Sequence, residues 1–169
     1  MNCDDNNYPK RKANRLSEYD YSSPGAYFIT ICTWKKRCIL GKIAVGAGIA
    51  RPPIVELSEY GRAVQSAICS IESHYENITV NNYVIMPNHV HLILQIHTNE
   101  DGRAMPAPTV STVIQQMKGT VCKQTGQKIW QKLFYDHVIR NEDDYWEIYN
   151  YIDSNPVKWI EDKLYNVGM

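Results

Sequence analysis

The sequence feature that most constrains the fold is the stretch 83–96, which reads YVIMPNHVHLILQI and is centred on His89 and His91. Side chains alternate between the two faces of a β-strand, so these two histidines point the same way. The apolar residues of the stretch point the other way and form one continuous row: Val90, Leu92, Leu94 and Ile96. We therefore predict a strand that buries its apolar face and offers its histidine face for chemistry. Two adjacent imidazoles on a rigid strand can bind one divalent cation.

Two ordinary histidines on a half-exposed strand are the alternative interpretation, which is the commoner one for a His-x-His pattern alone. Two observations favour the metal site. Of the five histidines in the chain, two share this strand face. Pro87 and Asn88 come directly before the pair and predict a tight entry into the strand, because proline fixes one backbone dihedral. A third ligand would have to come from elsewhere in the chain.

Length and composition indicate an ordinary globular domain. The chain has 169 residues, of which 44% are hydrophobic and 21% are charged, enough for one domain with a core. No apolar run approaches the roughly 18 residues of a membrane span, and the first residues lack the apolar segment of a secretory signal. We therefore expect a cytoplasmic protein that does not contact a membrane.

The five scattered cysteines form no Cys-x-x-Cys pair, which argues against a disulfide framework or a zinc knuckle. The formal net charge of zero argues against a purely charge-driven DNA binder and leaves room for a local basic groove.

The periodicity of the chain predicts an α+β fold. The expected elements are a strand over 26–34, a hairpin of 38–44 with 54–57, a helix over 58–73, strands over 78–86 and 89–96, a helix after Thr109, a strand or extended segment over 129–139, and a helix from about Glu142. This order indicates a ferredoxin-like antiparallel sheet with helices packed on one face. We expect residues 1–23 to form a polar N-terminal arm and residues 24–169 to form a single domain.

The last predicted helix contains a tyrosine that packing does not explain. Its core stripe follows helical spacing and consists of Tyr145, Ile148, Tyr149 and Ile152. At about 100° per residue, Tyr151 lies on the order of 110° from the centre of that stripe. Tyr151 is therefore a candidate nucleophile, and an ordinary surface tyrosine is the alternative.

Asn155 follows Tyr151 by four residues, on the same face of the helix. Its amide oxygen is a candidate third ligand beside His89 and His91. A helix C-cap is the alternative, because asparagine fills that position well and a residue before a proline avoids the α conformation.

Three segments together carry a resemblance to a known family. They read VIMPNHVHLIL, WQKLFYDHVIRNEDD and YNYIDSNPVKW, in that order along the chain. In combination they resemble the single-tyrosine HUH transposases, where HUH denotes two histidines around a hydrophobic residue. The branch that the chain resembles is the one associated with repetitive extragenic palindromes (REP elements). The similarity covers about residues 24 to 160.

This resemblance implies a ferredoxin-like core and a transposase that cleaves single-stranded DNA with a divalent ion, Mg²⁺ or Mn²⁺. It maps metal binding onto His89 and His91, the nucleophile onto Tyr151, and a further polar ligand onto Asn155. The stretch 43–53 has no counterpart in the pattern, and its role stays open. The implied partner is single-stranded or hairpin DNA.

The chemistry is consistent with these assignments. A phenol has a pKa of about 10 and is a weak nucleophile near neutral pH, so an ion that stabilises charge on the phosphate would assist it. Attack by Tyr151 would give a 5′-phosphotyrosine and a free 3′-hydroxyl, and a second 3′-hydroxyl could reverse the step and rejoin the DNA. Arg140, Lys158 and Trp159 flank the last helix and are candidate DNA contacts. His137 is a candidate for orienting a phosphate or for a structural hydrogen bond.

Two other functions fit the same residues. One is a domesticated protein that binds hairpin DNA without cleaving it, and the other is an HUH replication initiator, a class that usually has larger chains. A histidine-triad hydrolase is excluded because Ile93 occupies the place of its third histidine. The sequence leaves open which DNA is recognised, whether the protein is a monomer or a homodimer, and whether Tyr151 acts within its own chain or on a partner.

Overall fold

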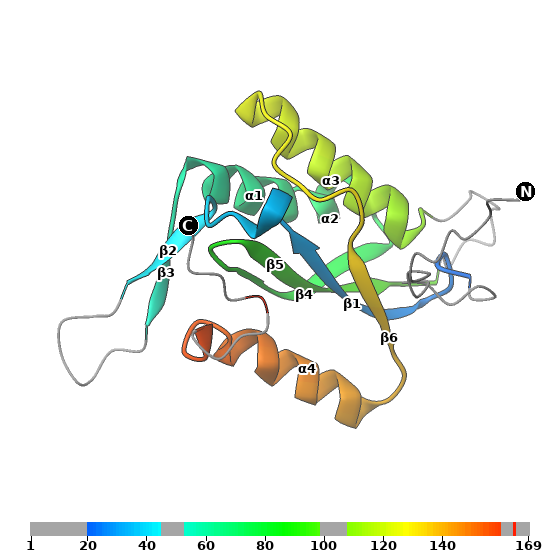
Figure 1. Cartoon of the computed structure of the whole chain (residues 1–169). Helices are drawn as coiled ribbons and strands as arrows, with labels where there is room; N and C mark the ends of the chain where they lie inside the picture. Colours follow the sequence, from blue (N-terminus) through cyan, green and yellow to red (C-terminus); the bar gives the residue numbers. More distant parts are fainter. Residues whose placement is uncertain (1–19, 45–52, 99–107, 160–163, 165–169) are drawn as a thin grey trace, which may run out of the picture.

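The computed structural model describes residues 20–44, 53–98, 108–159 and 164 (Figure 1). The expected N-terminal arm, up to residue 19, and residues 45–52 of the stretch 43–53 lie outside these residues. The elements follow one another as β1 (Gly25–Cys32), the 3-10 turn η1 (Trp34–Lys36), β2 (Gly41–Ala44), β3 (Ile54–Leu57), α1 (Glu59–Cys69), α2 (Ile71–His74), β4 (Ile78–Ile85), β5 (His89–Ile96), α3 (Val110–Thr125), β6 (Tyr135–Ile139) and α4 (Glu142–Ser154).

A four-stranded antiparallel sheet with the strand order β4-β5-β1-β6 forms the centre of the fold. This arrangement confirms the predicted α+β, ferredoxin-like class. The histidine strand β5 occupies one of the two inner positions, where His89 lies opposite Cys32 and His91 lies opposite Thr30. Strands β2 and β3 pair with each other as a separate hairpin, as predicted.

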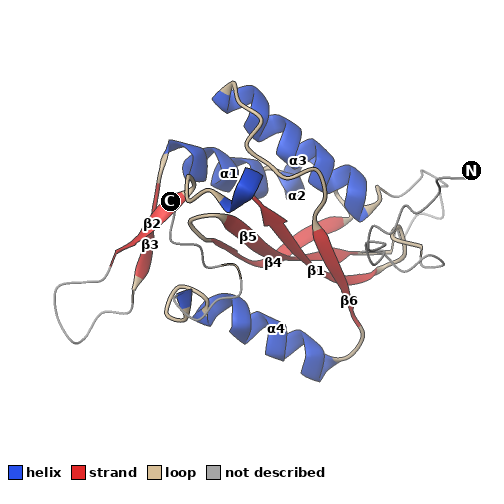
Figure 2. Ribbon diagram, viewed as in Figure 1, coloured by secondary structure: helices blue, strands red, loops and turns tan. Residues whose placement is uncertain are grey.

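Helices cover both faces of the sheet (Figure 2). On one face, α1, α2 and α3 pack over the apolar row of β5 and the buried apolar residues of β1, and together they form the hydrophobic core. The prediction of helices on one face is confirmed for these three. Helix α4 lies against the opposite face, the one that carries the histidines. It follows edge strand β6 after only residues 140 and 141, so the chain reverses around the edge of the sheet.

Side-chain caps fix where the helices begin. Ser58 accepts a hydrogen bond from the backbone N–H of Gly61 at 3.2 Å, and Thr109 accepts one from Thr112 at 3.2 Å. Each cap satisfies a backbone donor that has no partner within the helix. The helix expected over 58–73 is interrupted at Ser70, where α2 begins separately.

Two of the predicted extended segments are longer than the strands that they form. The first strand ends at Cys32, and the chain then enters η1, where Lys35 and Lys36 both have a φ of 54°. Within 129–139 only Tyr135–Ile139 joins the sheet, and Trp130 forms one isolated bridge with Thr33.

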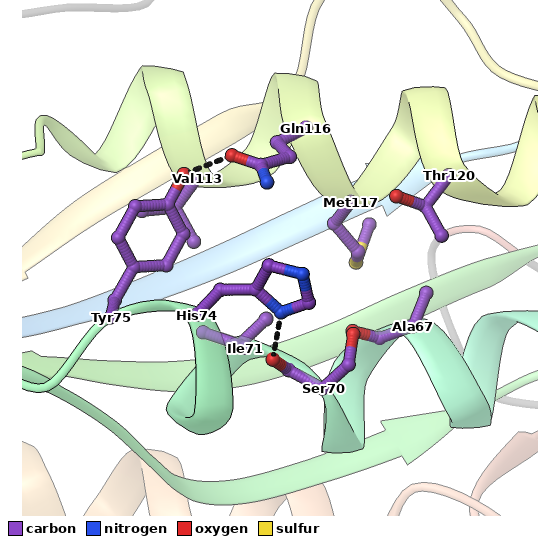
Figure 3. Close-up of a pocket in the computed structure, with 9 residues that line it drawn as sticks. All are labelled: Ala67, Ser70, Ile71, His74, Tyr75, Val113, Gln116, Met117 and Thr120. Carbon is purple, nitrogen blue, oxygen red and sulfur yellow. Dashed lines mark hydrogen bonds between the residues drawn. The ribbon is translucent and has the colours of Figure 1, made fainter.

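A small depression of about 20 Å³ lies between the α1–α2 segment and α3 (Figure 3). His74 donates from Nδ1 to the backbone oxygen of Ser70 at 2.7 Å, and Tyr75 donates to Gln116 across the gap. Its size suits at most one water molecule, so we attribute it to helix packing. Among the described residues, no helix combines the length and apolar character needed to cross a bilayer.

Candidate active site

His89 lies at the start of β5 and is fully buried, with 0% of its surface exposed. Its Nδ1 lies 2.7 Å from the amide oxygen of Asn88. The amide nitrogen of Asn88 donates to the backbone oxygens of Leu164 and Lys36 at 2.8 and 3.3 Å, so its oxygen faces His89 as an acceptor. Nδ1 of His89 therefore carries the proton and Nε2 carries the lone pair.

The Nε2 atom of His89 has the properties of a metal ligand. It is buried and has no hydrogen-bond partner. Burial lowers the pKa of His89 to about 3, and the nearby Lys36 ammonium contributes in the same direction. The imidazole is therefore neutral at physiological pH, and a neutral imidazole with an orienting hydrogen bond on its other nitrogen is the form that binds metals.

His91 lies beside His89, and their ring centroids are 4.5 Å apart. Its Nδ1 is 2.8 Å from the hydroxyl of Thr30 on the neighbouring strand. Its Nε2 is 3.3 Å from the hydroxyl of Tyr151. Phe28 stacks against the ring at a centroid distance of 5.2 Å. Thr30 and Phe28 thus fix the orientation of this imidazole from the same sheet.

The histidine face is buried, in contrast to the prediction of an open face. His91 is only 3% exposed. Helix α4 lies over this side of β4 and β5, and the Trp159 ring lies 5.9 Å from the ring of His89. The strand pattern identified which side chains share a face, but a local pattern carries no information about a segment 60 residues later that covers it.

Tyr151 belongs to α4 and remains 42% exposed, whereas Ile152 of the predicted core stripe is fully buried. The stripe prediction is confirmed to this extent, since Tyr145, Ile148 and Tyr149 are half-buried. The phenol of Tyr151 reaches the sheet, where its hydroxyl meets Nε2 of His91 and its ring lies edge-on to Phe28 at 6.1 Å. The structure therefore brings the candidate nucleophile to the histidine pair.

Asn155 is a buried residue at the C-cap of α4, and its backbone N–H donates to Ile152 at 3.3 Å. Its φ of −58° and ψ of −42° are helical, although residues before a proline avoid this region. Trp159, whose ring lies next to His89, follows Asn155 by four residues. Asn155 therefore serves as the C-cap, and its proposed use as a ligand stays a prediction.

The residues present fit a divalent ion bound mainly through nitrogen and amide oxygen. Among the described residues, no group of three His, Cys, Asp or Glu side chains is placed to hold a metal. Two imidazoles and an amide oxygen would leave coordination positions for water or a phosphate oxygen, as a catalytic metal requires. The observation that most supports a metal ion here is the Nε2 atom of His89, which is buried and has no hydrogen-bond partner.

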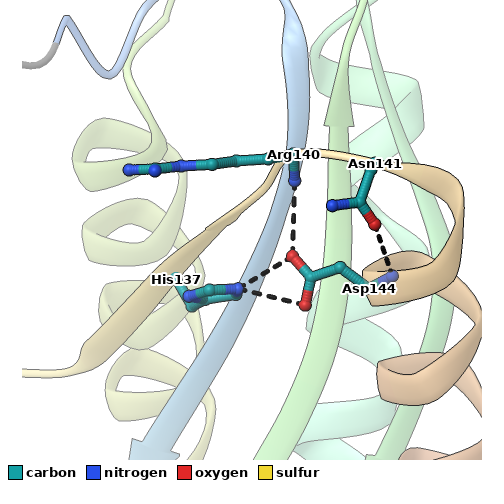
Figure 4. A network of polar contacts seen from close by, with 4 residues as sticks. All are labelled: His137, Arg140, Asn141 and Asp144. Carbon is teal, nitrogen blue, oxygen red and sulfur yellow. Dashed lines mark hydrogen bonds and ion pairs between the residues drawn. The ribbon is translucent and has the colours of Figure 1, made fainter.

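The predicted DNA contacts occupy different surroundings. Arg140 and Lys158 are exposed, whereas Trp159 is buried against His89. The side chain of Arg140 extends away from a polar network at the start of α4 (Figure 4). There His137 Nε2 lies 3.0 Å from Asp144 Oδ2, and the backbone N–H of Arg140 donates to the same oxygen at 3.3 Å. His137 thus makes a structural contact that holds α4 to β6.

A cleft of about 360 Å³ opens beside Tyr151. It is lined by Phe28, Thr30, Cys32, His91, Gln131, Leu133, Phe134, Tyr135, Tyr151 and Leu164. Most of these residues were not singled out from the sequence. Strand alternation alone places Phe28 and Thr30 on one face of β1. Only the register between β1 and β5 shows that this face is the one that carries His91.

No family model matches the chain. An uncharacterized protein of Haemophilus influenzae is 32% identical over 174 residues, which is 92% of this chain and 93% of that protein. The REP-associated tyrosine transposase of Escherichia coli is 33% identical over 85 residues, which is 48% of this chain and 47% of that protein.

The fold agrees with these sequence relations. A solved structure of a REP-associated tyrosine transposase bound to a REP hairpin superimposes with a TM-score of 0.62 and 25% sequence identity. The superposition covers 85% of this chain and 74% of that chain. In sequence and in fold, the chain is similar to the REP-associated tyrosine transposases.

Proposed function

We propose that this protein nicks and rejoins single-stranded DNA at hairpins, with Tyr151 as the nucleophile. The observation that carries the proposal is the 3.3 Å contact between the Tyr151 hydroxyl and Nε2 of His91. It joins a partly exposed phenol to the histidine pair, at the residues onto which the resemblance maps the reaction.

The proposed reaction exchanges one phosphate ester for another. The phenolic oxygen of Tyr151 bonds to phosphorus, and the bond from phosphorus to the 3′-oxygen breaks. The proton that leaves the phenol balances the one that the 3′-oxygen gains. A 5′-phosphotyrosine and a free 3′-hydroxyl result, and attack by another 3′-hydroxyl on the phosphotyrosine rejoins the strand. No energy source is consumed, because an ester bond is conserved at each step.

In this proposal His89, His91 and Asn155 hold a divalent ion, Mg²⁺ or Mn²⁺. When bound, the ion supplies positive charge to the phosphate oxygens as charge builds up in the transition state. The support from this chain is the set of hydrogen bonds that orient the two imidazoles. Asn88 and Thr30 contact the two Nδ1 atoms. Nε2 of His89 is buried without a hydrogen-bond partner, and Nε2 of His91 faces the Tyr151 hydroxyl.

We propose hairpin DNA as the substrate because a relative of this chain is seen bound to a REP hairpin. Arg140 and Lys158 are exposed and are the proposed contacts to the phosphate backbone. Trp159 was also predicted to contact DNA, but its burial against His89 leads us to propose that it packs the metal site instead. We retain residues 24–169 as one proposed catalytic domain.

The test is covalent adduct formation on a denaturing gel with hairpin DNA and Mn²⁺. Wild type is compared with Tyr151→Phe, His89→Ala and the matched control Tyr149→Phe, which alters another tyrosine of α4. We expect a protease-sensitive adduct with wild type and Tyr149→Phe, and none with the other two. Tight hairpin binding without any adduct would instead support a DNA-binding protein that has lost cleavage.

A further inference from the structure

Helix α4 covers only part of the histidine face. It contacts β4 and β5, while the cleft beside Tyr151 lies over the other two strands, β1 and β6. Phe28, Thr30 and Cys32 of β1 and Tyr135 of β6 line it. Thr30 pairs with His91 on one side and with Tyr135 on the other, so all three share this face. The cleft is therefore a continuation of the candidate active site along the sheet.

The lining of the cleft is uncharged and rich in aromatic rings. Among its lining residues are none with an acidic, lysine or arginine side chain, and His91 contributes only one edge. Leu133 and Tyr135 are 54% and 50% exposed at its rim. Solvent-exposed apolar surface of this kind marks a binding site when it lines a concave region.

We propose that this cleft receives one unpaired nucleobase, that of a nucleotide adjoining the scissile phosphate. The inference rests on the proposed function, because it takes Tyr151 as the point of attack. Tyr151 both lines the cleft and reaches His91. A phosphate held at its hydroxyl thus leaves the attached nucleoside at the mouth of the cleft, where aromatic faces are available for stacking.

The size and the polar groups of the cleft suit a single base. Its volume of about 360 Å³ is at the lower end of the range for small-ligand sites. Gln131 offers an amide that can both donate to and accept from a base edge. The backbone of Gln131 is held in place, because its N–H donates to Cys32 at 3.0 Å and its carbonyl accepts from Lys118 Nζ at 2.7 Å.

The test uses hairpin oligonucleotides that carry 2-aminopurine at one unpaired position at a time next to the hairpin. This base analogue loses fluorescence when it stacks on an aromatic ring. We expect binding to quench the emission at one position, and this position to adjoin the nick. Tyr135→Ala should reduce that quenching and weaken binding about fivefold or more. As a second variant, Leu133→Ala removes apolar surface at the rim and should weaken binding without removing an aromatic ring. Ile54→Ala removes an exposed aliphatic side chain on β3, outside the cleft, and should leave quenching and binding unchanged.

Two outcomes would overturn the inference. One is emission that stays unchanged at every unpaired position on binding. The other is quenching that persists unchanged in Tyr135→Ala together with unchanged binding by Leu133→Ala. Adduct formation by wild type on the same oligonucleotides separates the two proposals. An adduct without quenching contradicts the base site alone, whereas quenching without an adduct supports the base site and contradicts cleavage.

Discussion

The two histidines of β5 are oriented by different kinds of partner. His89 faces the amide oxygen of Asn88, whose own orientation is fixed by two backbone carbonyls. His91 faces the hydroxyl of Thr30, which can both donate and accept. In this structure the Tyr151 hydroxyl faces Nε2 of His91. If Tyr151 donates there, Nδ1 carries the proton and Thr30 accepts it. Thr30 is therefore a positioning residue for the histidine nearest the nucleophile.

Replacing Thr30 with valine removes this hydroxyl while keeping a β-branched side chain in the strand. Because such supporting hydrogen bonds orient metal ligands, we expect the rate of adduct formation or the Mn²⁺ affinity to fall about 10- to 100-fold. A titration of adduct formation with Mn²⁺ measures both quantities. Thr30→Ser keeps the hydroxyl and should stay close to wild type. Equal losses in the two variants would mean that strand packing, rather than the hydrogen bond, is responsible.

The burial of His89 predicts a pH dependence of stability in the metal-free protein. Its pKa is lowered from 6.5 to about 3 by burial, with a smaller contribution from Lys36. As the pH falls below 6.5, the unfolded chain takes up a proton at this residue and the folded chain does not. Stability is therefore lost between pH 6.5 and 3. Between pH 7.5 and 5 we expect the free energy of unfolding to fall by about 2 kcal/mol from this group.

Urea unfolding in EDTA at several pH values measures this effect against a His89→Gln reference. Glutamine does not titrate, and its amide can still donate to Asn88. Wild type should lose about 2 kcal/mol more than the variant over the same pH interval. If wild type and His89→Gln lose the same free energy of unfolding over this interval, His89 takes up its proton as readily in the folded state as in the unfolded chain.

Polar contacts contribute to the docking of helix α4 on the sheet. Ile152 is its only fully buried side chain among the described residues. A β-bulge in β4 leaves Asn81 as an extra residue between Val80 and Asn82. Consecutive strand residues normally point to opposite faces. Here both asparagines contact α4, because a bulge changes the direction of the side chains at this point of the strand. Asn82 Nδ2 donates to Asp153 at 2.9 Å and to the Tyr149 carbonyl at 3.4 Å. These contacts lie on either side of Tyr151 in the chain.

The variant Asn82→Ala tests whether this contact positions the nucleophile. We expect the free energy of unfolding to fall by about 1–2 kcal/mol, since two hydrogen bonds are lost. The rate of adduct formation should fall about tenfold or more, because small displacements of a reacting group have large kinetic effects. Hairpin affinity should remain within about twofold.

Asn81→Ala is the matched control for this experiment. Asn81 donates to the hydroxyl of Tyr145 at 3.1 Å, farther along α4 from Tyr151. We expect it to have a smaller effect on the rate. If Asn82→Ala weakens binding and cleavage in proportion, the residue contributes to the DNA interface instead of the placement of Tyr151.

For the whole molecule, the local sequence patterns predicted more of the elements than of their arrangement. The bounds of β5 and the caps at Ser58 and Thr109 follow from alternation and hydrogen-bonding chemistry within a few residues. The separation of Tyr151 from the core stripe of α4 also followed from helical spacing. The bulge at Asn81 did not, because an extra residue is defined only relative to the paired strand.

In the candidate site, too, the sequence predicted individual residues better than their surroundings. His89, His91 and Tyr151 were identified from spacing and from resemblance, and the structure brings His91 and Tyr151 together. The burial of the histidine face and the cleft over β1 and β6 depend on contacts between segments far apart in the chain, such as Thr30 with His91. Pairing of this kind cannot be deduced from the periodicity of either strand alone.

Metal binding should stabilise the whole fold if the histidine pair is a metal site. A ligand that binds only the folded state stabilises it by about 2.7 kcal/mol at a hundred times its Kd, which corresponds to a rise in Tm of about 5–10 °C for a chain of this size. We expect Mn²⁺ to produce this shift in wild type and not in His89→Gln, as measured by thermal unfolding. His97→Ala removes an exposed histidine at the other end of the strand and should retain the shift. A shift that persists in His89→Gln would locate the ion elsewhere.

The central claim is that the Tyr151 oxygen becomes covalently attached to DNA. The most direct measurement is mass spectrometry of peptides from wild type that has been incubated with hairpin DNA and Mn²⁺ and then digested with protease and nuclease. The account predicts a nucleotide phosphate on the peptide that contains Tyr151, with the fragment ions locating it on that residue rather than on Tyr145 or Tyr149. A nucleotide on either of those two tyrosines, or cleaved DNA with no modified peptide, would contradict it.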